Sequence, residues 1–182
     1  DPGAGTSNLT AGSVDGFILK LDSSGDFVWV KHLQGNSGEV NPKSTKIDSS
    51  GNIYTTGDFR YIADFDPGAG TTNLNTGGDV YDTFILKLNS SGDFVFVKQI
   101  IGVESNSSYY INLDSLGNIY TTGKFRNTTD FDPGAGTTEL TSMVNVDGYV
   151  LKLDSSGDFV WAKSFGGGDD DTPVKYIFFD AY

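Results

Sequence analysis

The alternation of apolar and polar residues along this chain predicts short β-strands separated by glycine-containing turns. Four such strands recur in a fixed order, and in one part of the chain they cover 109–113, 118–122, 149–153 and 159–163. Short turns of the kind Asp-Ser-Ser-Gly join the first strand to the second and the third to the fourth. Such turns suit antiparallel hairpins, because glycine accepts a positive φ and aspartate bonds nearby backbone N–H groups.

The same unit is repeated along the whole chain. DPGAGT begins at Asp1, Asp66 and Asp132, and each copy continues into FILKL or YVLKL and then into SSGDFVWVK or a close variant. Self-similarity at a period of about 65 residues is typical of repeat architectures. The sequence therefore predicts copies of one four-stranded unit.

Both faces of the predicted strands carry apolar side chains. In strand 27–31, Phe27 and Trp29 point to one side, whereas Val28 and Val30 point to the other. A sheet packed between two neighbouring sheets needs apolar groups on both faces, which favours a β-propeller. Aromatic residues recur at one position of the fourth strand, and we interpret them as packing between blades rather than as a sugar-stacking row: Trp29, Phe96 and Trp161.

The ordered set GNIYTTG, FILKL and SSGDFVWVK resembles the SBBP-type β-propeller repeats of bacterial secreted and surface proteins. The segment DFDPGAGT resembles a variant that is common in secreted repeat proteins of the Bacteroidetes type. This resemblance covers essentially the whole chain. It implies a bladed all-β fold and an extracellular or cell-surface location, and it brings no enzymatic activity with it.

The repeat divides the chain into a partial blade, two full blades and the beginning of another. We predict the third and fourth strands of a blade within 1–37, full blades at 38–103 and 104–168, and a first strand within 169–182. Closed propellers have at least about four blades of four strands. We therefore expect an open partial propeller, either a fragment of a longer protein or a piece completed by other chains. Exposed blade edges would favour self-association, and other repeats are expected partners.

Composition limits the partners further. The formal net charge is −12 and no lysine and arginine cluster occurs, so nucleic acid and anionic membrane surfaces are poor partners. No apolar run is long enough to span a membrane. The chain contains no cysteine, which excludes disulfides and thiol catalysis.

One end of each blade is predicted to be variable. From the DPGAGT aspartate to the aromatic residue that opens FILKL or YVLKL, the three copies differ slightly in length, so these connections absorb insertions. Surface loops of this kind often carry binding functions. We expect them to contact a protein or a glycan.

The carboxylates at this end form a candidate calcium site. The DFDPG segments place two aspartates at alternate positions before a turn, and a further aspartate precedes each third strand, which suits a hard cation bound by oxygen. The alternative interpretation is a structural turn, in which proline fixes φ and aspartate caps backbone N–H groups. The candidate calcium ligands are Asp64, Asp66, Asp82, Asp130, Asp132 and Asp147.

Catalysis has little support in the sequence. His32 is the only histidine, and Gln99 and Ser164 replace it in the other copies, so we predict a variable surface residue. The paired carboxylates recur in each copy, whereas an active site needs one asymmetric set of groups. We predict a non-enzymatic extracellular or cell-surface scaffold that acts through its loops. The alternative is a binding or sensory propeller module of a larger exported enzyme or transport-associated protein.

Overall fold

The structure, a computed structural model, describes residues 5–12, 14–166 and 177. Strands alone make up the regular structure of these residues, and none of the described segments forms a helix that could cross a membrane. The strands are β1 Gly16–Leu21, β2 Phe27–Leu33, β3 Glu39–Ile47, β4 Ile53–Arg60, β5 Ile62–Asp64, β6 Asn73–Asn75, β7 Tyr81–Leu88, β8 Phe94–Gly102, β9 Asn106–Leu113, β10 Ile119–Phe125, β11 Thr128–Asp130, β12 Glu139–Thr141, β13 Asp147–Leu153 and β14 Phe159–Phe165.

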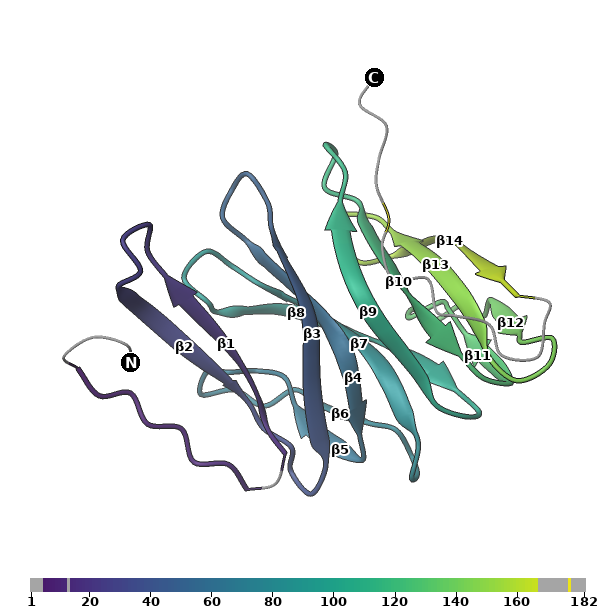
Figure 1. Ribbon diagram of the computed structural model, residues 1–182, viewed down its shortest axis with the longest axis horizontal. Coiled ribbons are helices and arrows are strands. Elements are labelled where there is room, and N and C mark those ends of the chain that lie inside the picture. Colours follow the sequence, from purple (N-terminus) through teal and green to yellow (C-terminus); the bar gives the residue numbers. More distant parts are fainter. Residues whose placement is uncertain (1–4, 13, 167–176, 178–182) are drawn as a thin grey trace.

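Antiparallel pairing groups the long strands into three blades that lie side by side (Figure 1). The first blade contains β1 and β2, the second contains β3, β4, β7 and β8, and the third contains β9, β10, β13 and β14. The sheets form an open row, which confirms the predicted all-β partial propeller. The strand predicted within 169–182 lies, apart from Ile177, outside the described residues.

The tight turns are built as the sequence predicts. Gly51 and Gly117, which join the first and second strands of the full blades, have φ values of 82° and 79°. At the first of these turns, Asp48 Oδ1 accepts hydrogen bonds from the backbone N–H groups of Ser50 and Asn52, both at 2.9 Å. The Asp48 carboxylate accepts hydrogen bonds from backbone N–H groups that have no strand partner within the turn. The two strands can therefore stay paired up to the turn.

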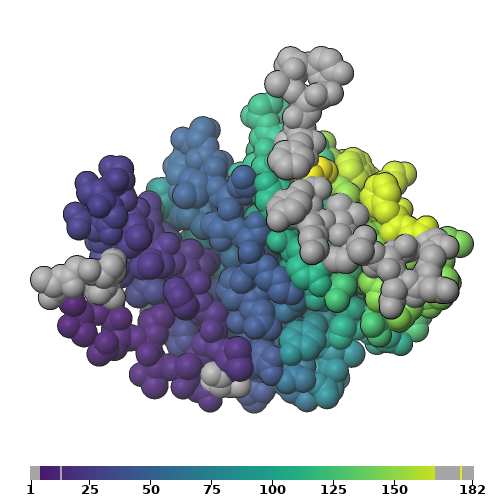
Figure 2. Space-filling view, in the orientation of Figure 1, coloured from purple at the N-terminus to yellow at the C-terminus, as the bar shows by residue number. Residues whose placement is uncertain are grey.

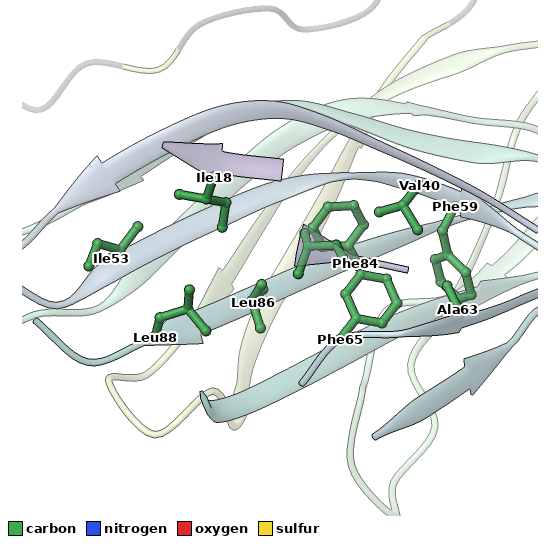
Figure 3. Close-up of a cluster of buried hydrophobic side chains, with 10 residues drawn as sticks. Ile18, Val40, Ile53, Phe59, Ala63, Phe65, Phe84, Leu86 and Leu88 are labelled. Atoms are coloured by element: carbon green, nitrogen blue, oxygen red, sulfur yellow. The ribbon is translucent and has the colours of Figure 1, made fainter. Parts of the chain in front are cut away.

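The core lies between the blades and not within one of them. Phe84, Leu86 and Leu88 of β7 are fully buried in one cluster with Ile18 and Leu33 of the first blade, and Figure 3 shows Ile18 facing this group. The equivalent cluster at the next boundary joins residues of the second blade to residues of the third: Tyr54, Ile85, Ile100, Ile111, Ile119, Phe125, Phe131, Tyr149, Leu151 and Leu153.

Trp29 packs against the first of these clusters and Phe96 against the second. Both residues occupy the same position of the repeat, which confirms the predicted packing between blades for Trp29 and Phe96, whereas for Trp161 it stays a prediction. The alternating apolar residues on the two faces of each strand are therefore explained by two different neighbours.

The DFDPGAGT segments differ from the irregular loops that the sequence suggests. Each forms a short hairpin, β5–β6 or β11–β12, inserted between the second and third strands of its blade. β11 pairs with β8, the fourth strand of the preceding blade, through Thr129 opposite Gly102 and Asp130 opposite Ile101. β5 makes a single bridge to the preceding blade, between Asp64 and Gln34, the residue that follows β2. Backbone hydrogen bonds therefore connect successive blades in addition to the apolar cores.

The phenylalanine of each DFD segment anchors its hairpin. Phe65 is fully buried, with its ring centroid 4.8 Å from that of Phe84. Phe131 occupies the same position in the third blade, 4.9 Å from the ring centroid of Tyr149. Because the flanking aspartates point to the other side of the strand, one tripeptide supplies both a core residue and polar groups for the loop.

Candidate functional site

The first aspartate of each DFD segment holds its own hairpin together. Asp64 Oδ1 accepts hydrogen bonds from Asp66 N at 3.0 Å and from Thr72 N at 2.8 Å. Asp130 Oδ1 accepts the equivalent bonds from Asp132 N and Thr138 N at the same two distances. These are the contacts that the alternative interpretation, a structural turn capped by aspartate, predicts.

The second aspartate of each segment makes a more local contact. Asp66 Oδ1 accepts a hydrogen bond from Gly68 N, and Asp132 Oδ1 accepts one from Gly134 N, both at 2.8 Å. In each copy, one proline lies between the aspartate that accepts this hydrogen bond and the glycine that donates it. The two copies have the same geometry, as a repeated structural element requires.

The aspartates that the sequence places before the third strands lie within the first two residues of β7 and β13, in a different environment. Asp82 is fully buried and accepts hydrogen bonds from Gln99 Nε2 at 2.7 Å, Asn106 Nδ2 at 3.0 Å and Gly102 N at 3.1 Å. Burial raises the pKa of this carboxyl above its ordinary value, and the three hydrogen bonds oppose that rise without reversing it. Asp147, its counterpart in the third blade, is buried and accepts a hydrogen bond from Met143 N at 3.3 Å.

The structure does not gather the candidate calcium ligands into one cluster. Within 5–12, 14–166 and 177, no group of three or more histidine, cysteine, aspartate or glutamate side chains is placed to hold a metal ion. Asp64 and Asp130 serve hairpins, whereas Asp82 and Asp147 serve the beginnings of third strands. Calcium binding stays a prediction.

His32 is not the surface residue that the sequence suggests. Its Nε2 lies 2.7 Å from Asp15 Oδ2, and its side chain is only 16% exposed. Asp15 occupies the repeat position of Asp82, and Gln99 at the position of His32 binds Asp82 in the same way. The first two blades therefore share a contact to a carboxylate at the beginning of the third strand, and the residue that makes it is His32 in one blade and Gln99 in the other.

A groove opens at the end of the blades where the predicted variable loops emerge. Its volume is about 760 Å³, and residues of all three blades line it. The strands β3 and β9 lie beside each other here, and Ile111 N donates to Ser44 Oγ at 3.3 Å between them (Figure 1). We call it the strand-end groove; its polar and aromatic lining includes Asp15, Asn41, Lys43, Asp58, Tyr81, Ser107, Tyr109 and Lys124.

The strand-end groove has a charged and aromatic centre. Lys43 Nζ forms an ion pair with Asp58 Oδ2, and it also lies 4.6 Å from the ring centroid of Tyr109. Lys124 Nζ lies over the same ring at 5.9 Å. Within the described part of the chain, Lys124 has no carboxylate partner. The groove therefore presents one neutralised lysine and one lysine whose charge is not neutralised by a carboxylate.

A second ion pair lies beside Tyr81 of the groove lining. Tyr81 Oη donates to Glu39 Oε2 at 2.6 Å, and Glu39 also pairs with Arg60. The hydrogen bond from Tyr81 is the main cause that lowers the pKa of Glu39, and the same bond raises the pKa of Tyr81. This hydrogen bond therefore holds the Tyr81 side chain in position beside Glu39.

The groove residues differ between copies of the repeat, although the strands that carry them match. The segment IYTTG is identical in β4 and β10, and the next residue is Asp58 in one copy and Lys124 in the other. These residues face Asn41 and Ser107 across the strand pairs. The sequence analysis did not predict this site because it considered the residues that are the same in each copy of the repeat. The positions at which the aligned copies differ are the signal that could have indicated it.

Comparison with known proteins supports the fold more than the function. No protein family matches the chain as a sequence profile. The chain is similar to an uncharacterized WD repeat-containing protein of Acanthamoeba polyphaga mimivirus, with 29% identity over 172 residues, covering 81% of the chain and 12% of the relative. This similarity supports a propeller-type repeat. The relative is viral, and the SBBP type, a bacterial source and secretion stay predictions.

Proposed function

We propose that this segment is a non-enzymatic repeat scaffold that binds an extended segment of a partner protein in the strand-end groove. One observation carries the proposal: the groove lining presents different residue types at equivalent repeat positions of the second and third blades, whereas the segment IYTTG of β4 and β10 is identical. Lys43 and Tyr109 occupy equivalent positions of the repeat, as do Asp58 and Lys124, and all four line the groove. A surface with a purely structural role would not require different residue types at equivalent positions. Similarity to a WD repeat-containing protein is consistent with a scaffold.

The chemistry of the groove favours a peptide that carries a carboxylate. Lys124 offers a positive charge in a chain whose net charge is −12, so an acidic side chain or a C-terminal carboxylate would gain a charge-assisted hydrogen bond there. Tyr81 and Tyr109 add flat surfaces of the type that is enriched in protein interfaces. A groove of about 760 Å³ is large enough to hold several side chains.

An array of immobilised random 12-residue peptides, with the purified chain as the probe, tests this function. We expect selection of peptides that contain Asp or Glu, and we expect Lys124→Glu and Tyr109→Ala to weaken their binding at least about tenfold. Lys46→Glu is the matched control, because Lys46 lies on β3 outside the groove lining and the charge change is the same. Equal binding by the wild type and Lys124→Glu would contradict the proposal.

We further propose that the segment acts outside the cell or on its surface. The support is the resemblance to SBBP-type repeats together with the acidic composition, which is rich in serine, threonine, asparagine and glycine. The chain spans about one eighth of the length of its curated relative, which is consistent with a role as a binding or sensory module within a larger exported protein. Fractionation of cells that express the full-length protein tests the location, and recovery only from the cytosol would contradict it.

Calcium is a separate proposal for the hairpin aspartates. Its support is the pair of alternate carboxylates in each DFD segment, of which Asp66 and Asp132 lie outside the buried core. Calorimetric titration with Ca²⁺, combined with thermal melting in calcium and in EDTA, is expected to show heat and a higher melting temperature. Asp66→Asn should reduce both effects, and the absence of heat and of a melting shift in the wild type would discard the site.

A further inference from the structure

Two further hollows continue from the strand-end groove along the boundary between the second and third blades. The first has a volume of about 380 Å³ and shares Tyr81, Ser107 and Lys124 with the groove. The second, of about 230 Å³, shares Glu104 with the first. Figure 2 shows the loop ends of these two blades side by side along the lower edge of the molecule. The groove and the two hollows therefore form one continuous path across this boundary.

The first of these hollows presents two positive charges. Lys124 lies near the end of β10 and Arg126 directly follows that strand, so the two side chains are on the same side of it, and both line the hollow. In the part of the chain that the structure describes, neither of them has an ion-pair partner. Glu104 lines the same hollow but forms no ion pair with either cation.

The second blade neutralises the equivalent arginine with residues of its own. Arg60, at the repeat position of Arg126, forms ion pairs with Glu39 and, at 2.8 Å, with Asp79. In the third blade, Ser105 stands at the position of Glu39, and the loop between β12 and β13 reads SMVNV and contains no acidic residue. Both carboxylates beside Arg60 belong to its own blade, so the comparison involves no neighbouring blade, and the third blade supplies neither of them.

Apolar side chains lie exposed at the far end of the path. Val103, Met143 and Val144 are 68, 75 and 62% exposed, and we call these three residues the apolar patch. Val144 lines the second hollow, as does the residue that follows Val103. The corresponding loops at the boundary between the first and second blades, 35–38 and 76–79, read GNSG and TGGD and contain no large apolar residue. Apolar residues that gather on an exposed surface typically mark an interaction site.

We propose that the partner segment runs along this path, with an acidic residue held by Lys124 and Arg126 and a bulky apolar residue packed on the apolar patch. This mode of binding rests on the proposed function and adds the chemistry of the partner. A carboxylate beside the two cations gains charge-assisted hydrogen bonds, and the arginine can bind both of its oxygens. The apolar residue removes the patch from water. An acid alone would leave the patch exposed, and an apolar residue alone would leave the two cations unpaired, so the segment carries both.

Fluorescence anisotropy with a labelled peptide, chosen from those that the random array selects, tests this mode of binding. The selected peptides are expected to combine Asp or Glu with a nearby large apolar residue. Arg126→Glu and Val144→Asp are each expected to weaken binding about tenfold. Lys46→Glu is the control for the charge reversal. Leu116→Asp is the control for the loss of an apolar side chain, because Leu116 is 80% exposed and lies in a tight turn outside the path. Circular dichroism verifies that each variant is folded.

Substitutions in the peptide test which residue meets which surface. Replacing its acid by the corresponding amide should weaken binding to the wild type and remove the effect of Arg126→Glu, and replacing its apolar residue by alanine should remove the effect of Val144→Asp. Absence of any peptide that binds, or binding that Lys124→Glu leaves unchanged, overturns the proposed function together with this mode of binding. Binding that needs Lys124 and Tyr109 but is unchanged in Arg126→Glu and Val144→Asp overturns the mode of binding alone.

Discussion

Gln34 of the first blade and Asp64 of the second exchange two backbone hydrogen bonds, with N···O distances of 2.8 and 3.2 Å. The same boundary element recurs where β11 pairs with β8. A hairpin inserted in one blade therefore extends the sheet of the blade before it. This arrangement satisfies backbone groups at an edge that would otherwise be open to pairing with other chains.

The first prediction concerns the carboxylate that holds this hairpin. Asp130→Ala removes the acceptor for two backbone N–H groups, those of Asp132 and Thr138, and is expected to lower the free energy of unfolding by about 1–3 kcal/mol. Asp132→Ala removes one acceptor at a more exposed position and is expected to cost about 0.5 kcal/mol. Urea unfolding measures both. Equal effects of the two substitutions would contradict the structural role of Asp130.

The second prediction concerns the buried ring between the two aspartates. Phe131 is fully buried against Phe125 and Tyr149, so Phe131→Ala is expected to cost about 3–5 kcal/mol, because it leaves a cavity between two blades. Phe131→Leu keeps most of the volume and is expected to cost much less. Hydrogen exchange in the alanine variant should show lost protection in β11 as well as in β13. Lost protection confined to β11 would mean that the hairpin does not support the blade.

The sequence was sufficient for the blades because their signals are local. Turn glycines such as Gly51 and the alternation in segments such as 27–31 specify hairpins and their two apolar faces directly. The hairpins β5–β6 and β11–β12 were missed because each strand has three residues, too few for alternation to stand out, and because their partner is the preceding blade. A contact between blades has no signature in neighbouring residues.

The groove and the role of His32 were missed for a related reason. His32 and Gln99 are different residue types, so the repeat alignment suggested a position without a constraint. Both donate to an aspartate that is distant in sequence, Asp15 or Asp82, and hydrogen-bonding ability is the property that they share. Chemical equivalence across the repeat is visible in the sequence only when the aspartate is already known to be buried.

The third prediction concerns pH. Burial raises the pKa of Asp82 in the folded chain above the value it has in the unfolded chain. Between those two values the folded state binds more protons, so stability falls as pH rises through the raised pKa of the folded state. Asp82→Asn removes this contribution. The stability of the wild type relative to Asp82→Asn should therefore fall as pH rises from below the ordinary pKa of aspartate to above the raised pKa of Asp82.

Asp114 supplies a control of opposite sign for the pH experiment. Its burial acts to raise its pKa, but hydrogen bonds from Asn118 and Leu116 outweigh that effect and leave the pKa lowered. Stability from this carboxylate is therefore present above the ordinary pKa and is lost as pH falls through the lowered one. Relative to Asp114→Asn, the wild type should gain stability as pH rises. Urea unfolding at a series of pH values measures both slopes, and parallel curves for the three proteins would contradict the assignment.

The fourth prediction compares the same glycine in two blades. Gly25 and Gly92 occupy equivalent turns with φ values of 86° and 82°, so alanine at either position carries a backbone cost of about 1–2 kcal/mol. Only Gly92 lies beneath a neighbouring blade, where a Cβ would crowd Trp29 and the Lys31 side chain. Gly92→Ala is therefore expected to cost about 1–3 kcal/mol more than Gly25→Ala when both are measured by urea unfolding of the dilute chain. Equal costs would mean that the packing of Trp29 on this glycine adds nothing to the boundary between the first and second blades.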